Sequence, residues 1–310
     1  ETEFSQARQV AEHCGTDHQE IHVGNEDVLK QVPRVLWHFE YPFSRPAVYP
    51  FFFLFKRLKE HVTVSLTGEG ADELFAGYNR YEPFTKPGTP SPDAISSGVF
   101  TKDASAFFKR PVLPKEVQLS TLMGAPFKKL PWDKRLNHVL KFDIRTSIPY
   151  FHCVKLDKTS MAHSHEVREP YLDYPLVEFA MTVPTKYKYV GAEKKILLQK
   201  AAAPLLPADI VKRRKLPIVM PLSHFFESSL AEFADGLLSE KTLKQRDIVN
   251  VERVRKLIDD VRHKRDLKDA SAVTEDNAYR QLLFLTNLEL WTRMFIEGEK
   301  KPKLDIASYL

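Results

Sequence analysis

Residues 64–74 read VSLTGEGADEL, and this stretch decides the fold that the sequence predicts. The β-branched, apolar run over 62–67 is typical of a buried parallel strand, and residues 72–81 have a helical pattern. Gly68 and Gly70 stand at the turn between them, where a missing side chain lets the backbone approach a ligand closely. Because ligands of open α/β sheets bind beyond the carboxyl ends of strands, we expect a binding turn in an α/β layer.

Two carboxylates, Glu69 and Asp72, give this turn its chemistry. Backbone amides at the start of a helix favour anions, but carboxylates repel phosphate unless a divalent cation lies between them. Mg²⁺ prefers one or two carboxylates together with phosphate oxygens and water. The turn therefore predicts a site for Mg²⁺ with a nucleotide or pyrophosphate, with Asp72 as a metal ligand. The alternative is an acidic surface turn whose Asp72 and Glu73 only favour the helix N-terminus.

The rest of the chain divides into two portions by pattern. Residues 1–85 alternate between helix and strand, which predicts the remainder of an α/β nucleotide-binding portion. A stretch rich in Pro, Ser and Gly over 83–98 favours a boundary, and residues 86–310 predict a mainly helical portion. Before the boundary we expect helices over 3–14, 28–40 and 51–60, a strand over 18–23 and a loop over 41–49. Beyond the boundary we expect only helices, over 135–164, 175–182, 194–203, 222–238, 251–268 and 277–296.

A second charged stretch, KLDKTSMAHSHEVREPYLD over 155–173, mixes acids and bases with apolar residues. Arg168 would suit a substrate carboxylate through a bidentate contact, so the stretch could orient a small polar substrate such as an amino acid. An interhelical network of ion pairs explains the same pattern.

Lysines mark two further positions. Lys194 and Lys195 stand where a helix is expected to begin, and cations there oppose the helix dipole. Their placement favours a task such as neutralising phosphate charge, with a solvated lysine pair as the alternative. The basic run KRRK over 212–215 has the same two interpretations.

Composition excludes several classes of protein. The 310 residues carry a net charge of only +5, without the basic stripe and module of a nucleic-acid binder. The longest apolar run, 48–55, contains Pro50 and is far shorter than the roughly 20 residues of a membrane span. Cys14 and Cys153 lie far apart without a paired spacing, which favours a reducing, cytoplasmic compartment.

Three long stretches in order resemble the C-terminal synthetase domain of glutamine-hydrolysing asparagine synthetases, and two shorter ones fit the same pattern. They are VSLTGEGADELFAGYNRY (64–81), LDKTSMAHSHEVREPYLDYPLVEFAMTVP (156–184) and EKKILLQKAAAPLLPADIVKRRKLPIVMPL (193–222), with AEHCGTDHQEIHV (11–23) and NLELWTRMF (287–295). The resemblance covers nearly the whole chain. It implies a partial parallel-sheet α/β domain of the ATP pyrophosphatase type (adenine nucleotide α-hydrolase-like), with a large helical C-terminal part.

The resemblance also implies a reaction. The side-chain carboxylate of aspartate would attack the α-phosphorus of ATP, giving β-aspartyl-AMP and pyrophosphate, and ammonia would then displace AMP. A glutaminase domain would supply this ammonia from glutamine, Mg²⁺ would assist, and a homodimer is compatible with the family.

Residue roles follow from the matching positions. Three residues match catalytic positions of the family. Glu69 matches a glutamate beside the acyl-adenylate and the attacking amine, and Asp72 matches an aspartate that helps hold Mg²⁺ and pyrophosphate. Lys194 matches a lysine at the α-phosphate. Thr67, Gly68 and Gly70 match the turn that binds the nucleotide. Asp173 matches a residue that shapes the substrate pocket, and Arg168 and the basic-stretch residue Lys215 are expected beside it at the substrate.

The sequence departs from the family in three respects. The family's Ser-Gly-Gly-x-Asp-Ser-Ser loop, which binds pyrophosphate, is absent, and none of the 11 glycines is adjacent to another. The glutaminase domain with its N-terminal nucleophilic cysteine is also unmatched. We therefore expect a cut chain, with the loop lying before Glu1, that is inactive by itself. Leu198 stands where the family usually has arginine.

Two other functions stay open. One is an amide-forming ligase of the same fold that acts on a different carboxylate, as a β-lactam synthetase or a sugar-acid amidotransferase does. Glu69 favours the asparagine type, because ring-closing relatives carry a different residue there. The other is a degenerate, non-catalytic homologue, which the missing loop favours and the retained Glu69, Asp72 and Lys194 disfavour.

Overall fold

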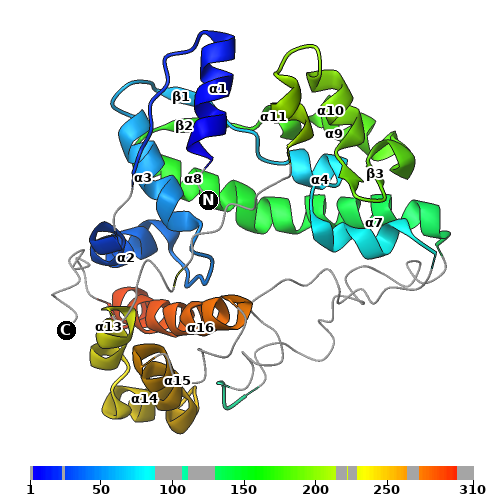
Figure 1. Cartoon of the computed structure of the whole chain (residues 1–310). Coiled ribbons are helices and arrows are strands. Elements are labelled where there is room, and N and C mark those ends of the chain that lie inside the picture. The colour runs from blue at the N-terminus through cyan, green and yellow to red at the C-terminus, as the bar shows by residue number, and fades with distance from the viewer. Residues whose placement is uncertain are drawn as a thin grey trace.

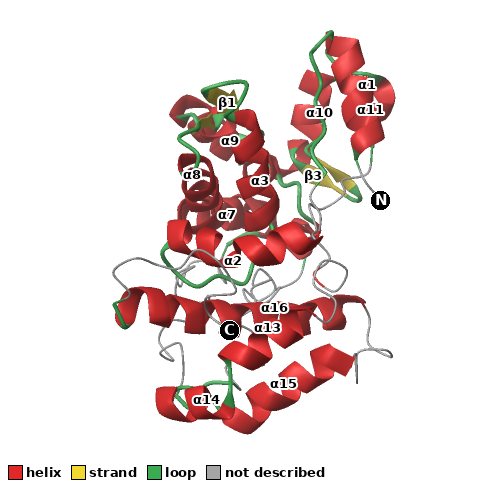
Figure 2. Cartoon of the chain, turned by 90° about the vertical axis from the view of Figure 1, so that its left-hand side faces the viewer, coloured by secondary structure: helices red, strands yellow, loops and turns green. Residues whose placement is uncertain are grey.

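The computed structural model describes residues 3–22, 25–87, 107–110, 130–213, 222, 229–263 and 272–298. Its described part is mostly helical with a small parallel sheet, as an α/β domain with a large helical part requires. Figures 1 and 2 show the sheet and its helices above a separate layer of helices from the C-terminal third of the chain. The expected boundary over 83–98 falls largely outside the described residues, so the division at residue 85 stays a prediction.

The sheet joins segments that are a hundred residues apart. Strand β1 (Val64–Leu66) runs parallel to β2 (Glu166–Arg168), with Ser65 opposite Val167. Helix α8 (Val154–Met161) leads into β2 and packs against α3 (Val48–Leu58), which leads into β1. The parallel pairing places the carboxyl ends of both strands at one edge of the sheet.

The remaining elements of the upper part surround this sheet. The antiparallel pair of β3 and β4 lies close to η1, which packs along α7. Bounds, in chain order, are α1 (Phe4–Cys14), α2 (Asn25–Phe39), α4 (Ala71–Phe75), η1 (Asn79–Thr85), α7 (Trp132–Arg145), η4 (Ile148–Cys153), η5 (Pro170–Leu172), α9 (Tyr174–Thr182), η6 (Thr185–Tyr187), β3 (Tyr189–Val190), β4 (Glu193–Lys194), α10 (Ile196–Ala202) and α11 (Ala208–Lys212).

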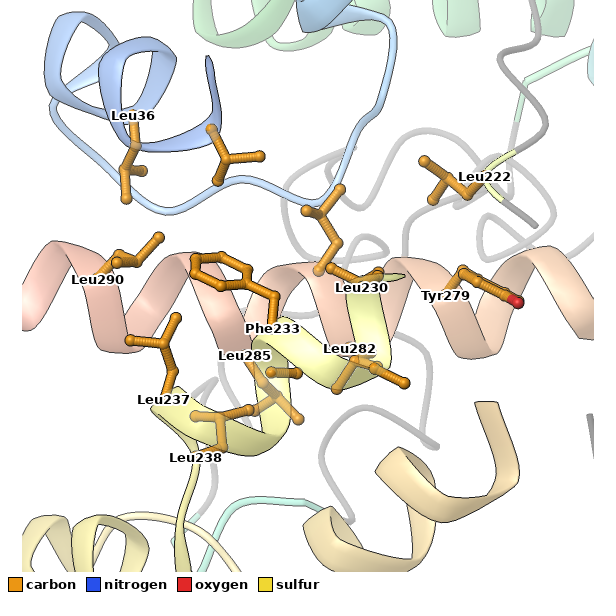
Figure 3. Close-up of a cluster of buried hydrophobic side chains, with 14 of the residues drawn as sticks. Leu36, Leu222, Leu230, Phe233, Leu237, Leu238, Tyr279, Leu282, Leu285 and Leu290 are labelled. Atoms are coloured by element: carbon orange, nitrogen blue, oxygen red, sulfur yellow. The ribbon is translucent and has the colours of Figure 1, made fainter. Parts of the chain in front are cut away.

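The main hydrophobic core lies between the lower helices and α2. The lower layer contains α13 (Ser229–Leu237), α14 (Glu240–Arg246), α15 (Val251–His263), α16 (Ala272–Trp291) and the π-helical turn η7 (Thr292–Ile296). In Figure 3, Phe233 of α13, Leu282 of α16 and Leu36 of α2 belong to one cluster of buried side chains. Since α2 also packs against α8, it connects this core to the helices beside the sheet.

Two strand predictions were wrong in detail. Residues 18–22 form an irregular connection that pairs with neither described sheet, and its Glu20 side chain accepts from Arg8 at 2.7 Å. Strand β1 is parallel as predicted but not buried, since Leu66 is 70% exposed. Within the described part of the chain β1 has a strand neighbour on one side only.

Three helix predictions were also wrong in their bounds. The helix expected over 72–81 ends at Phe75, because Ala76 takes the left-handed conformation at φ 59°. The helix expected over 135–164 divides at residues 146–153, where Pro149 cannot donate a backbone hydrogen bond and the π-helical turn η4 follows α7. Lys194 belongs to β4, and α10 begins only at Ile196.

Strands were missed where they are very short. β2, β3 and β4 contain two or three residues each, too few for alternation to be visible in the sequence. The helices expected over 28–40, 51–60, 175–182 and 277–296 are confirmed to within a few residues. None of the described helices is both long and apolar enough to cross a membrane.

Candidate functional site

The acidic turn and the second charged stretch meet at the carboxyl edge of the sheet. The backbone N–H of Thr67, just beyond β1, donates to the carbonyl of Arg168 at the end of β2, at 3.0 Å. Parallel strands place their carboxyl ends at the same edge, which is the usual ligand position of an open α/β sheet. Two segments that the sequence singled out separately are therefore one site.

The turn has the backbone freedom that the sequence predicted at one of its glycines. Gly70 has φ 91°, a left-handed conformation that favours glycine. A Cβ atom at Gly70 would stand 2.3 Å from Cδ2 of Leu172 in η5, so the turn lies directly against the segment that follows β2. Gly68 is exposed with open space around it, and Ala71 begins α4.

Glu69 is fixed at this edge by two side chains, one histidine and one lysine. A ring N–H of His152 donates to one carboxylate oxygen, and Nζ of Lys155 donates to the other at 3.0 Å. Burial alone would raise the pKa of Glu69, but the hydrogen bond from His152 and the charge of Lys155 outweigh it and lower the pKa to about 2. Glu69 is consequently ionised throughout the neutral range, with its carboxylate in one orientation.

Local helix geometry explains why both partners reach Glu69. His152 lies in the π-helical turn η4 and Lys155 in the first turn of α8, three residues later, so the two side chains share one helix face. π-helical turns occur frequently at functional sites. The Lys155 ammonium also lies 4.1 Å from the centre of the Phe51 ring, an additional favourable contact for a cation.

A second glutamate extends this cluster into the interior. Glu73 of α4 is fully buried, and the Tyr78 hydroxyl donates to its Oε1 at 2.7 Å. Nε2 of His152 stands 3.5 Å from the same oxygen, so the imidazole lies between Glu69 and Glu73. Burial, followed by the charge of Glu73, raises the pKa of the Tyr78 phenol, which therefore stays protonated and able to donate.

Arg45 brings an unmatched positive charge close to the cluster. Its guanidinium stacks on the Phe151 ring at 4.1 Å, and no ion pair to it occurs among the described residues. Burial, followed by repulsion from Arg80, lowers the pKa of Arg45. Arg80 itself pairs with Asp143 at 2.9 Å. Arg45 is thus a partly desolvated cation, and an anionic ligand could supply a partner of opposite charge to its guanidinium.

Asp72 pairs with Lys195, the second of the two neighbouring lysines that the sequence singled out. Nζ of Lys195 lies 2.9 Å from Oδ1 of Asp72. The neighbouring Lys194 instead donates to Asn79 and lies beside the Tyr189 ring. Lys194 remains close to the acidic turn through η1, but Lys195 is the lysine that contacts it.

The structure says less about the three residues that the sequence predicted to bind the substrate. Arg168 is largely exposed and stands 3.5 Å from Glu166 on its own strand. Asp173 is exposed before α9, where its carbonyl accepts from Val177, and no partner of its carboxylate is found within the described ranges. Lys215 lies outside the described residues. The roles of all three stay predictions.

A cavity of about 420 Å³ lies close to the acidic turn, between α8 and β2. Its lining includes Cys153 and the carboxylates Asp157, Glu166 and Glu169. Burial, followed by the charge of Glu169, raises the pKa of the Cys153 thiol to about 11. Burial also raises the pKa of Glu169, and the charge of Glu69 adds to this effect, so the cavity and Glu69 share one electrostatic environment.

The donor set of the turn suits Mg²⁺ bound together with phosphate. Asp72 contributes one partly exposed carboxylate, and the Lys195 ammonium shows that a cation is accommodated beside it. The described residues include no group of three or more His, Cys, Asp or Glu able to hold a metal by themselves. One carboxylate completed by phosphate oxygens and water is a usual Mg²⁺ environment, so Asp72 fits that role.

The residues that sequence reasoning missed are Arg45, His152 and Lys155, and Lys195 was noticed only as one of a pair. The spacing of His152 and Lys155, three residues apart in a helical stretch beside a predicted acidic turn, was the available signal. Arg45 carried none, because it lies in a proline-punctuated loop whose position only the packed structure reveals.

Comparisons with known proteins identify the family of this chain. The family model described as asparagine synthase matches residues 1–293. Asparagine synthetase (glutamine-hydrolyzing) 1 of Bacillus subtilis (strain 168) is 27% identical over 274 residues, which are 77% of this chain and 43% of that protein. Asparagine synthetase B (glutamine-hydrolyzing) of Escherichia coli (strain K12) is 24% identical over 243 residues, 77% of this chain and 35% of that protein.

A plant relative shows the same coverage. Asparagine synthetase (glutamine-hydrolyzing) 3 of Arabidopsis thaliana is 23% identical over 253 residues, 78% of this chain and 36% of that protein. The chain therefore spans less than half the length of these three relatives.

Proposed function

Since the chain belongs to the asparagine synthase family, we propose that it supplies the amide-forming site of a glutamine-dependent asparagine synthetase. In this proposal the fold is of the ATP pyrophosphatase type. The side-chain carboxylate of aspartate attacks the α-phosphorus of ATP, pyrophosphate leaves, and ammonia displaces AMP from the resulting β-aspartyl-AMP. The product is asparagine.

The ionised, oriented carboxylate of Glu69 is the observation that carries the proposal. When ammonia attacks an acyl carbon, positive charge develops on its nitrogen, and a preoriented carboxylate stabilises that charge without reorganising. His152 and Lys155 keep Glu69 ionised and fix both of its oxygens. A largely buried carboxylate held by His152 and Lys155 suits a site at which a cationic transition state forms.

The first step requires groups that stabilise negative charge on the departing pyrophosphate. Asp72 would hold Mg²⁺, which neutralises phosphate charge when bound. Lys194 and, beyond the described residues, Lys215 are the further cations that we assign to the phosphates. Thr67, Gly68 and Gly70 would let the nucleotide approach the backbone of the turn.

The aspartate substrate carries negatively charged carboxylates and a positively charged amino group, and the site contains side chains of opposite charge for both. Arg45, desolvated and without an ion-pair partner among the described residues, would bind an anionic group. Arg168 at the end of β2 and Asp173 just before α9 would contact the α-carboxylate and the α-amino group from the exposed side. Their exposure suits residues that bind a substrate rather than one another.

The proposal needs parts outside these 310 residues. The relatives are named as glutamine-hydrolyzing proteins, so we assign the supply of ammonia to a glutaminase domain in a longer protein. The pyrophosphate loop that the resemblance implies does not occur in this sequence. Without that loop and domain, we expect the chain alone not to convert ATP.

Formation of AMP and pyrophosphate by a full-length protein that contains this chain tests the proposal. With ATP, Mg²⁺ and an ammonium salt, aspartate is expected to raise AMP formation at least tenfold over the reaction without aspartate, while the isolated 310 residues form none. If a sugar acid or another amino acid replaces aspartate as the only effective carboxylate, the acceptor is wrong but the ligase chemistry stands. If no carboxylate promotes AMP formation, the degenerate, non-catalytic alternative holds instead.

A further inference from the structure

We propose that Lys195 is an internal counter-ion of Asp72. In the free chain the Lys195 ammonium occupies the position of the divalent cation, and it moves to phosphate oxygens when metal and pyrophosphate bind. The inference rests on the proposed role of Asp72 and adds a regulatory contact to it. Binding of the metal and of the phosphate would thereby become coupled.

The contact itself is a direct ion pair at the edge of the site. Nζ of Lys195 lies 2.9 Å from Oδ1 of Asp72, and the two side chains are 26% and 21% exposed. A pair at this depth is screened only in part by solvent, and both side chains remain partly exposed although Oδ1 of Asp72 is itself buried. The ammonium therefore neutralises Asp72 without sealing the position.

The backbone around Lys195 is shaped to make this contact. Lys195 has φ 52°, in the left-handed region that costs a non-glycine residue free energy, at the junction of β4 and α10. Lys194 precedes it and points instead to Asn79. The left-handed residue turns the chain between the two lysines, so that Lys195 rather than Lys194 meets the acidic turn.

Gly77 provides the space that the pair occupies. A Cβ atom at Gly77 would lie 1.6 Å from Oδ1 of Asp72 and 2.4 Å from Cε of Lys195. Both side chains thus lie against a position that carries no side chain. The backbone N–H of Gly77 also donates to the carbonyl of Asp72 at 2.9 Å, which fixes this surface to α4.

Competition between two cations follows from this geometry. A divalent cation that binds Oδ1 of Asp72 would displace the ammonium, and the exchange would remove the contact between Lys195 and Asp72. Phosphate oxygens beside the metal would restore an anionic partner to Lys195. The metal is therefore expected to bind weakly alone and more strongly with pyrophosphate, which is a coupling between two ligands at one site.

The experiment measures metal binding rather than activity. Mn²⁺ serves as the probe, and free Mn²⁺ is followed by electron paramagnetic resonance during titration of the 310-residue chain. Removing a partly exposed ion pair is expected to strengthen Mn²⁺ binding about fivefold in Lys195→Met. Inorganic pyrophosphate should then increase Mn²⁺ affinity less in Lys195→Met than in the unsubstituted chain.

Controls separate this contact from general effects of charge and from the proposed function. Lys200→Met removes an exposed lysine from α10, the helix that follows Lys195, and should leave Mn²⁺ affinity unchanged. Circular dichroism checks folding, and Lys195→Gln replaces the methionine variant if that one fails to fold. Equal or weaker Mn²⁺ binding in a folded Lys195 variant would overturn the inference. If Asp72→Asn abolishes Mn²⁺ binding in that case, the metal role of Asp72 survives; if Asp72→Asn changes nothing, both assignments fail.

Discussion

Glu69→Ala is expected to reduce asparagine formation by a full-length protein containing this chain by a factor on the order of 10³. The substitution removes the one carboxylate that His152 and Lys155 hold ionised at the edge of the sheet. It also leaves the His152 ring and the Lys155 ammonium without the carboxylate to which they donate. Asparagine would be quantified by chromatography with saturating ATP, aspartate and ammonium salt.

The comparison variant for Glu69→Ala is Glu178→Ala. Glu178 is an exposed residue of α9, and its loss should leave the rate within a factor of about two, since isolated surface substitutions have small effects. Far-UV circular dichroism should show the same helical content in both variants. Glu69→Ala with the rate of the unsubstituted protein would refute the assignment of Glu69 to the reacting centre.

Leu282→Ala is expected to lower the free energy of unfolding by about 2–5 kcal/mol. Leu282 lies in α16, is completely buried, and belongs to the cluster that joins α16 to α13 and α2 (Figure 3). Truncation removes buried methyl groups and leaves a cavity that helices packed on several sides cannot readily close. Urea unfolding followed by circular dichroism would give the difference.

Leu205→Ala is the matched control for this core substitution. Leu205 follows α10 and is 68% exposed, so removing the same atoms there should change the free energy of unfolding by about 0.5 kcal/mol or less. If the two leucines had similar effects, the cluster between α2, α13 and α16 would not be the core that stabilises the lower layer.

Periodicity predicted most helices because burial imposes it. In α15, Val254, Leu257, Ile258 and Val261 are buried at intervals of three and four residues, the pattern that indicates a helix in the sequence. The same reasoning failed for α4, which ends after five residues because Ala76 is left-handed. That conformation depends on contacts around Asp72 and Gly77 and leaves no trace in periodicity.

The strands show a different limit. β1 was recognisable from its β-branched residues, but β2 follows α8 directly and contains only three residues, two of them charged. Its identity as a strand comes from pairing with β1 almost exactly a hundred residues earlier, and nothing local specifies that partner. A long-range contact of this kind has to be observed in the folded chain.

The acidic turn was identified from residue types, whereas its partners were not. Glu69 and Asp72 stand out because carboxylates beside glycines at a strand end suggest a ligand. His152, Lys155 and Lys195 reach them only through the π-helical turn η4 and the left-handed backbone of Lys195, which are features of three-dimensional packing. The sequence thus predicted the anions of the site but did not show which side chains fix them.

Oxygen transfer is the most direct test of the proposed reaction. A full-length protein containing this chain would be given aspartate labelled with ¹⁸O in the side-chain carboxylate, together with ATP, Mg²⁺ and glutamine. Attack of that carboxylate on the α-phosphorus, followed by displacement by ammonia, predicts one ¹⁸O atom in each AMP by mass spectrometry. Unlabelled AMP, or ADP with the label in inorganic phosphate, would contradict it.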